Sequence, residues 1–556
     1  MNFKENESAQ KLRGGYYTPY DLAHYLSKWI AETNPETILE PSCGDGIFLE
    51  SLSASLAAHA SITAIELDRT EAKLAAERSS MLKNLSINVI CTDFLEWYLT
   101  SQQKNSQYDA VVGNPPFIRY QYLSKKDQEF SEQIFKQHNL RFTKHTNAWV
   151  PFVIASLSML RSGGRLAMVL PSEILHVLHA QSLRFYIGQQ CKKLIIIDPE
   201  EIWFDGTLQG VVLLLAEKKR NINEHSAGLG IIQTKGKSFL GQSRSDYFNK
   251  TNLINGKTVE GKRTRALLTK KELDLFEGVI NSENVHQFTD IAEVDVGLVT
   301  GANKFFLVND ETVHNYDLEK WSHPMFGRSE HCPGILYDKK QHQDNSDAGL
   351  PANFLWFDVN DISELSNSAH EYIRLGESAN LHTRYKCKTR KPWFKVPSVY
   401  ATQVGMLKRA HDMPRLILNE VGAYTTDTAY RITTKNVDAK KFVYCFINSL
   451  TALSSELEGR HYGGGVLELV PSEIEKLYIP IPTQTRTAMK TLDKMIRNSS
   501  SSQVLASQDS RVLGDLGLTP DEIVCLHAAW NKLRNRRQRT SRAINQSPSR
   551  NQLSFS

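Results

Sequence analysis

The residues best suited to chemistry lie in one short stretch, where an apolar run ends at Gly113 and is followed by Asn114-Pro115-Pro116-Phe117. Proline has no backbone N–H and fixes its own φ, so this sequence predicts a buried strand that stops abruptly in a stiff loop. The loop offers three chemical groups in a row: an amide side chain, the backbone carbonyl of Pro115 and an aromatic ring.

These groups suit the methylation of an amino group whose lone pair is delocalised into an aromatic base. The Asn114 side-chain oxygen and the Pro115 carbonyl can each accept one N–H, which pushes the nitrogen towards tetrahedral geometry and frees its lone pair to attack a sulfonium methyl. Phe117 can stack on the base. Catalysis of this kind rests on positioning and hydrogen bonding, with no shifted pKa. Taken alone, the motif is equally consistent with a turn that follows a strand.

The chain before this loop shows a regular alternation of predicted strands and helices. Strands are expected over residues 37–40, 62–66, 87–91 and 109–112, with helices over 47–58 and 69–82 between the first three. An acid or an asparagine stands at or just beyond the carboxyl end of each strand, namely Glu40, Glu66, Asp93 and Asn114. In a doubly wound parallel sheet these ends share one edge, which is where ligands bind.

The side chains at this edge match the parts of a nucleoside. The glycines of the turn at residues 41–46 let the backbone approach a ligand closely. Glu66 can accept both hydroxyls of a ribose, and Asp93 can accept from an adenine amino group while Phe94 packs on the ring. The turn is not G-x-G-x-x-G and no phosphate-binding lysine follows it, which argues for a ligand without a pyrophosphate. A single acid at a strand end is more often a helix N-cap; four at an even spacing favour a site.

Together, Glu40-Pro41-Ser42-Cys43-Gly44-Asp45-Gly46, Glu66, Asp93-Phe94 and the Asn114–Phe117 loop resemble the motifs of class I S-adenosylmethionine-dependent methyltransferases. Upstream, Gly14-Gly15-Tyr16-Tyr17-Thr18-Pro19 is similar to the gamma group of DNA adenine methyltransferases, the TaqI type. This resemblance covers most of residues 14–480. It implies an enzyme that methylates the N6 amine of adenine in duplex DNA, using Asn114, Pro115 and Phe117. The implied contacts of S-adenosylmethionine are Tyr17, Thr18, Glu40, Ser42, Cys43, Gly44, Asp45, Gly46, Glu66, Asp93, Phe94 and Asn114.

A second base-stacking ring is implied by the same resemblance. Phe204 stands where the family places an aromatic opposite Phe117, and flipped bases are held between such side chains. Trp203 is its neighbour, and the sequence leaves open which of the two stacks on the base. A core aromatic is the alternative interpretation.

The second half of the chain differs in composition. Residues 219–262 are polar and are expected to form a connecting loop with short hairpins, and short strands with glycine turns follow from residue 288. Residues 384–400 hold six basic residues, four aromatics and no acid, a pattern typical of a nucleic-acid surface. This region resembles the target-recognition domain of the gamma group. The residues predicted to contact DNA are Arg384, Lys386, Lys388, Arg390, Lys391, Trp393, Lys395 and Arg460.

The predicted fold is therefore α/β, a doubly wound and mostly parallel sheet followed by a mixed α+β domain. We expect a catalytic domain over residues 1–265, a target-recognition domain over 266–490, and a C-terminal region over 491–556. In that last region, 499–510 is expected to be a polar linker, 511–534 a helix and 543–556 disordered. The six basic residues of 531–542 are interpreted equally as a DNA-backbone contact or as a free basic end.

Length and composition restrict the class of protein and the cellular compartment that we expect. The 556 residues, 41% hydrophobic and 23% charged, indicate a globular protein of two or three domains. No apolar run is long enough for a membrane helix, and the N-terminus lacks a signal sequence. Seven scattered cysteines without a C-x-x-C pair suggest neither disulfides nor zinc. We expect a monomer without a metal in the cytoplasm of a bacterium or archaeon.

Two other functions are weighed against this one. Asn-Pro-Pro-aromatic also occurs in methyltransferases that act on a protein glutamine amide or on a guanine amine of ribosomal RNA, but the Tyr17 segment and the long C-terminal domain favour DNA. A DNA-binding subunit without activity is disfavoured by the intact Asn114, Asp93 and Glu66. The sequence shows no nuclease constellation, so we expect that the chain alone does not cut DNA. The resemblance implies the modification enzyme of a restriction system, whose cognate restriction endonuclease would be encoded separately and need not contact it.

Overall fold

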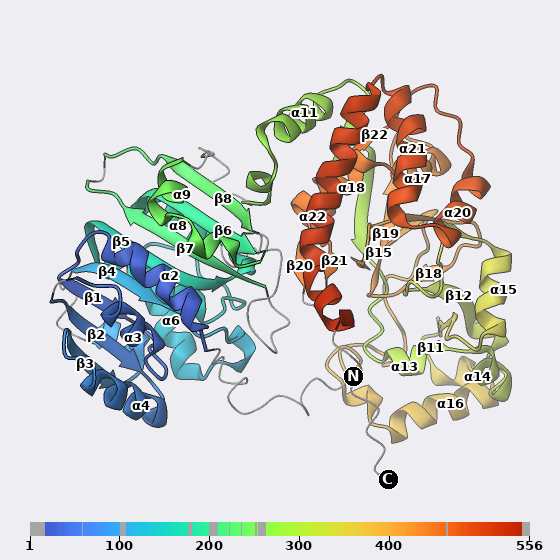
Figure 1. Cartoon of the computed structure of the whole chain (residues 1–556). Coiled ribbons are helices and arrows are strands. Elements are labelled where there is room, and N and C mark those ends of the chain that lie inside the picture. The colour runs from blue at the N-terminus through green and yellow to red at the C-terminus, as the bar shows by residue number, and fades with distance from the viewer. Residues whose placement is uncertain are drawn as a thin grey trace, which may run out of the picture. The chain divides into compact units, whose positions relative to one another are not determined.

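The computed structural model describes residues 17–57, 59–100, 107–175, 181–199, 210–221, 223–234, 236–250, 253, 263–462 and 465–546. The chain divides into two compact units, shown in Figure 1. The first unit comprises Met1–Leu267 with Gln538–Ser556, and the second unit comprises Leu268–Arg537. Among the described residues, no helix combines the length and the apolar character needed to cross a membrane.

The first unit is built on an eight-stranded sheet (Figure 1). Its strands, in spatial order, are β3 (Ser86–Cys91), β2 (Ser61–Glu66), β1 (Thr37–Glu40), β4 (Tyr108–Gly113), β5 (Leu160–Pro171), β7 (Val211–Lys218), β6 (Cys191–Pro199) and β8 (Gly228–Thr234). Neighbouring strands run parallel except that β7 is antiparallel to both β5 and β6. The predicted doubly wound, mostly parallel sheet is confirmed, and its first four strands lie within one residue of the predicted bounds.

Helices cover both faces of this sheet. The helices are α2 (Tyr20–Ala31), α3 (Ile47–Ser53), α4 (Arg69–Ser80), α5 (Phe94–Thr100), α6 (Lys125–Gln137), α7 (Trp149–Met159), α8 (Gln181–Gln190) and α9 (Arg244–Lys250). Successive strand residues point to opposite faces, so Leu39 and Val111 pack with α5 to α8, while Ile38 and Val112 pack with α2, α3, α4 and α9. Burial on both faces explains why β4 is buried at all six positions.

One part of the predicted connecting segment forms regular structure. Residues 219–262 were expected to be loop and short hairpins, but β8 joins the sheet in parallel with β6, and α9 packs Phe248 on the core. A strand bounded by glycine and polar residues carries a weak local signal. Its pairing with β6 is what stabilises it.

The second unit contains several smaller sheets and a separate hydrophobic core. Its strands are β9 (Val285–Gln287), β10 (Ala292–Val296), β11 (Leu307–Val308), β12 (Ser322–Phe326), β13 (Leu336–Tyr337), β14 (Asn353–Leu355), β15 (Val404–Leu407), β16 (Arg409–Ala410), β17 (Leu416–Asn419), β18 (Tyr424–Thr425), β19 (Ala429–Thr434), β20 (Arg460–Tyr462), β21 (Val466–Glu468) and β22 (Tyr478–Pro480). The largest sheet has the order β10-β19-β15-β17-β13. This unit is the mixed α+β part that the sequence predicts.

The helices of the second unit lie between and after these strands. They are α11 (Lys270–Ile280), α12 (Phe288–Ile291), α13 (Asn303–Phe306), α14 (Asp310–Asn315), α15 (Lys339–Asp347), α16 (Asn367–Ser378), α17 (Ala439–Cys445), α18 (Ser449–Glu458), α19 (Pro471–Ile474), α20 (Met489–Asn498), α21 (Ser501–Asp515) and α22 (Pro520–Gln546), the last of which belongs to this unit up to Arg537.

The C-terminal helices correct the predicted linker. Residues 499–510 lie mostly in α21, which begins with a capping box between Ser500 and Gln503. Its apolar residues, although few, face one side and are buried. A composition rich in Ser and Gln suggested a linker, but capping and a narrow apolar stripe are sufficient for a packed helix.

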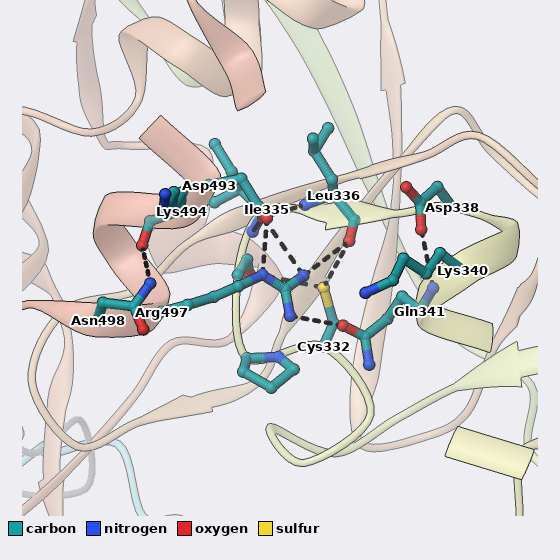
Figure 2. Close-up of polar contacts among 12 residues, drawn as sticks. Cys332, Ile335, Leu336, Asp338, Lys340, Gln341, Asp493, Lys494, Arg497 and Asn498 are labelled. Atoms are coloured by element: carbon teal, nitrogen blue, oxygen red, sulfur yellow. Dashed lines mark hydrogen bonds and ion pairs between the residues drawn. The ribbon is translucent and has the colours of Figure 1, made fainter. Parts of the chain in front are cut away.

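Helix α20 is fixed to the second unit by one carboxylate. Figure 2 shows Asp493 between the backbone of β13 and the guanidinium of Arg497. Asp493 Oδ1 accepts from the N–H of Ile335 at 2.7 Å, and Arg497 Nε donates to Asp493 Oδ2 at 2.6 Å. Arg497 also donates to Gln341 Oε1 of α15 at 2.6 Å. Helix α20, which lies mostly in the part expected to be linker and tail, is therefore packed structure.

Candidate active site

The loop after β4 is held at the carboxyl edge of the sheet by two side chains. Ser42 Oγ donates to the backbone oxygen of Asn114 at 3.0 Å, and Asn114 Nδ2 donates to Thr18 Oγ1 at 3.1 Å. At the far end of the loop, the N–H of Ala148 donates to the Ile118 oxygen at 2.9 Å. The amide of Asn114 is thus oriented by a residue that lies 96 positions earlier in the chain.

Tight packing explains the glycine that precedes Asn114. A Cβ on Gly113 would lie 3.3 Å from Pro41 Cδ, and Glu40 Cγ is also near. The ends of β1 and β4 therefore approach closely enough to place the turn at residues 41–46 beside the catalytic loop. Phe117 is partly buried and packs against the hydrophobic clusters on both faces of the sheet.

The turn after β1 is joined to the end of β2. Gly44 and Gly46 have φ of 52° and 88°, the left-handed region that glycine adopts most readily. The Gly44 N–H donates to Glu66 Oε2 at 2.9 Å, and the Asp68 N–H donates to Glu66 Oε1 at 2.9 Å. Each carboxylate oxygen keeps further lone-pair capacity, so Glu66 is held in place with acceptors for a pair of hydroxyl groups.

Asp93 and Phe94 follow the end of β3, and Phe94 is the first residue of α5. Asp93 Oδ1 accepts from the Glu96 N–H at 2.8 Å and so caps α5, while burial raises the pKa of its carboxyl group. Phe94 is only 2% exposed, and its ring lies 5.0 Å from that of Phe152. Asp93 is therefore at the edge as expected, whereas the ring of Phe94 packs in the core.

Two contacts at this edge were not predicted. Tyr17, 51% exposed, donates its hydroxyl to Glu71 Oε1 at 2.7 Å. Arg78 bridges to Asp45 Oδ2 at 2.8 Å and so orients an acid of the glycine-rich turn. Glu71 and Arg78 lie on α4, far in sequence from their partners, and the packing of α4 against α3 brings Arg78 to Asp45. No local sequence signal marks either residue.

Comparisons with known proteins agree with this geometry. Residues 2–292 match the model of the family N-6 DNA Methylase, and residues 260–513 match the C-terminal domain of type II methyltransferase M.Eco57I. The chain belongs to the N-6 DNA methylase family. It is accordingly an adenine-N6 DNA methyltransferase that depends on S-adenosylmethionine, which confirms the prediction from the sequence.

Relatives of this methylase span most of its length. Type II methyltransferase M.AccI of Acinetobacter calcoaceticus is 23% identical over 474 residues, covering 83% of this chain and 84% of the relative. M.HindII of Haemophilus influenzae is 25% identical over 350 residues, covering 60% and 62% of the two chains. Among solved structures, the type IIG restriction endonuclease BpuSI is 14% identical with a TM-score of 0.43, covering 97% of this chain and 68% of that one.

The methylase contains a carboxylate that fits a cationic cofactor. Glu40 ends β1, is fully buried, and neither of its carboxylate oxygens has a hydrogen-bond partner among the described residues. Burial and then the carboxylates of Glu66 and Asp45 raise the pKa of Glu40 well above its ordinary value. A buried acid of this kind is satisfied by a positive group or a hydrogen-bond donor, and S-adenosylmethionine carries both.

We expect the affinity of the wild type for S-adenosylmethionine to rise with pH. In Glu40→Gln this affinity should depend less on pH. An acid with a raised pKa keeps its proton to a higher pH than an ordinary carboxyl group, and a cationic ligand favours release of that proton, so low pH opposes binding. The linkage limit is about tenfold per pH unit for one proton, and it ends above the raised pKa. Calorimetry in two buffers of different ionisation enthalpy counts the released protons. Equal proton release by the wild type and Glu40→Gln would contradict this role of Glu40.

The predicted DNA-binding residues of the methylase have unequal environments. Lys395 pairs with Asp358 at 3.1 Å, and Arg460 pairs with the buried Glu473 at 2.9 Å. Trp393 donates to Glu377 Oε1 at 3.2 Å and packs on the core of the second unit. Phe204 and Trp203, the two candidates for the second stacking ring, lie outside the described residues.

Proposed function

We propose that this methylase flips its target adenine out of the duplex and presents the amine to the Asn114–Phe117 loop. The observation that carries this proposal is the fixing of Asn114 by Thr18 and by Ser42, whose turn also binds Glu66 through the Gly44 N–H. An exocyclic amine inside a base stack cannot reach a loop at a sheet edge. Enzymes that act on a base therefore unpair it, at a cost of a few kcal/mol, and hold it against aromatic side chains.

The residues of the loop then have distinct roles. S-adenosylmethionine supplies the methyl group on a sulfonium when bound. The Asn114 side-chain oxygen and the Pro115 carbonyl accept the two N–H groups of the amine and direct its lone pair. Phe117 stacks on the flipped adenine, and Phe204 is proposed as the ring on the other side. Because these contacts strengthen as the nitrogen becomes tetrahedral, they act on the transition state.

The second unit is proposed to read the target sequence. Its match to the C-terminal domain of M.Eco57I and the names of the relatives, which are type II methyltransferases, support a modification enzyme of the gamma group in a restriction–modification system. We propose that it works as a monomer in the cytoplasm and protects sites cut by a separately encoded restriction endonuclease. Direct base contacts would specify the site and phosphate contacts would set the register.

Base flipping is testable with 2-aminopurine in place of the target adenine. We expect its fluorescence to increase when wild-type enzyme binds, because extrusion relieves quenching by neighbouring bases. Phe117→Ala should alter the intensity, since the extruded base loses a stacking ring, and should bind the duplex nearly as well. The target position comes from sequencing DNA of a host that expresses the chain. If 2-aminopurine fluorescence does not increase in the wild-type complex, base extrusion is refuted. Methylation of RNA in preference to DNA would refute the proposed substrate.

A further inference from the structure

The basic segment, residues 384–400 of the second unit, is anchored by side chains that are buried in the hydrophobic core. Cys387, Phe394 and Val396 are at most 3% exposed and join the hydrophobic core. Next to these buried residues in the sequence, Lys386, Thr389 and Lys391 line a pocket of about 480 Å³, together with Val299, Arg390, Lys395 and Pro397. Binding residues supported by a packed core are held in position before a ligand arrives.

Arg390 forms one wall of this pocket and is itself fixed. Its Nη1 donates to the Thr300 oxygen at 2.7 Å and its Nη2 to the Val299 oxygen at 2.6 Å. These partners are neutral carbonyls, so the guanidinium keeps its positive charge. Gly301, with φ of 79°, permits the approach of the two segments, because a Cβ there would lie 2.8 Å from Lys386 Cβ.

The lysines of the segment are not equivalent. Lys395 is partly neutralised by Asp358, and Lys388 does not line the pocket. Lys386 and Lys391 do line it, and neither forms an ion pair with an acid in the described part of the chain. The pocket therefore combines two lysines whose charges no carboxylate offsets with a fixed guanidinium, which are cationic groups that bind a phosphate diester. The Thr389 hydroxyl is engaged elsewhere, because it donates to the Lys386 oxygen at 3.0 Å.

We infer that this pocket binds one phosphate of the DNA backbone, with Lys386 and Lys391 contributing the charge and Arg390 the fixed wall. The inference rests on the proposed role of the second unit in target recognition. Sequence reading requires that the protein be placed in one register on the duplex, and phosphate contacts do this without reading bases. Lys388 and Lys395, although part of the same basic run, are then not the principal contacts.

The test is the salt dependence of duplex binding by the full chain. Each neutralised phosphate contributes about 0.9 to the slope of log K against log salt. Lys386→Gln and Lys391→Gln should each lower the slope and weaken binding on every sequence alike, and the double variant should lower it by about 0.9, the full contribution of the one phosphate. Lys388→Gln, with the same loss of charge four residues or fewer away, should lower the slope by clearly less.

The outcomes separate the inference from the function on which it rests. Thermal midpoints of the variants should equal that of the wild type, because the substituted side chains lie at the surface. If the wild type binds and methylates duplex DNA but the three single substitutions change the slope equally, or not at all, the pocket is refuted and the function stands. If the wild type neither binds nor methylates duplex DNA, the proposed function itself fails.

Discussion

Asn114→Ala should abolish methylation while both S-adenosylmethionine and DNA still bind. The amide contributes to the site through a contact with the amine that strengthens in the transition state, so the loss should appear in turnover and not in affinity. Loss of one oriented hydrogen-bonding group of this kind costs roughly 10²–10³-fold in rate, and loss of lone-pair activation adds to it. Single-turnover methyl transfer at saturating cofactor and DNA measures the effect directly.

Thr18→Val provides the matched control for this prediction. Valine has nearly the same shape, but it removes the oxygen to which Asn114 Nδ2 donates at 3.1 Å. The amide remains, with less constraint on its orientation, so we expect a loss of about tenfold, the value of one modest hydrogen bond. Turnover of Asn114→Ala within a few-fold of the wild type would exclude the positioning mechanism. A Thr18→Val enzyme as inactive as Asn114→Ala would move the essential role to Thr18.

The edge of the first sheet was predictable because its signals are local. Apolar runs of four to six residues ending at an acid or asparagine specify strands, and the parallel connection brings their ends together. Glu40, Glu66, Asp93 and Asn114 thus fall at one edge in the structure, as the spacing predicts. Phe94 was the exception, since a residue after a strand end can face the core or the ligand and its sequence does not distinguish the two.

The features that sequence missed depend on contacts between distant segments. The bridge from Arg78 to Asp45 spans 33 residues and the one from Lys395 to Asp358 spans 37. The basic residues of 384–400 look alike in the sequence. In the folded chain some of them pair with an acid, as Lys395 does with Asp358, and others do not. The basic residues of 531–542 show the same effect, since Arg537 is neither a free end nor an exposed contact: its side chain is fully buried.

Arg537→Met should strongly destabilise the second unit. In the wild type, Arg537 Nη2 and Nε contact the Glu456 carboxylate at 2.6 and 2.9 Å, and Nη1 and Nη2 donate to the oxygens of His411 and Asp412 at 2.6 and 2.9 Å. A further bond reaches the Gly465 oxygen. One side chain on α22 therefore joins α18 to the chain before β17 and to the β20–β21 turn. Its loss leaves the buried Glu456 carboxylate without its guanidinium partner and with His461 Nε2 at 3.5 Å beside it, and the loss of one partner of a buried pair costs about 3–5 kcal/mol.

Two further variants distinguish the buried charge from lost packing. Glu456→Gln combined with Arg537→Met removes the stranded charge, so this double variant should recover part of the stability lost in Arg537→Met alone. Lys340→Ala, which breaks an exposed pair with Asp344 whose lysine side chain is 83% exposed, should change stability by less than about 1 kcal/mol. Urea unfolding measures the free energy of unfolding of each variant, and hydrogen exchange measures the protection of α18 and β21. If Arg537→Met left the hydrogen-exchange protection of α18 and β21 unchanged, α22 would not hold these elements together. The basic residues of α22 would then again be interpreted as a DNA-backbone contact or as a free basic end.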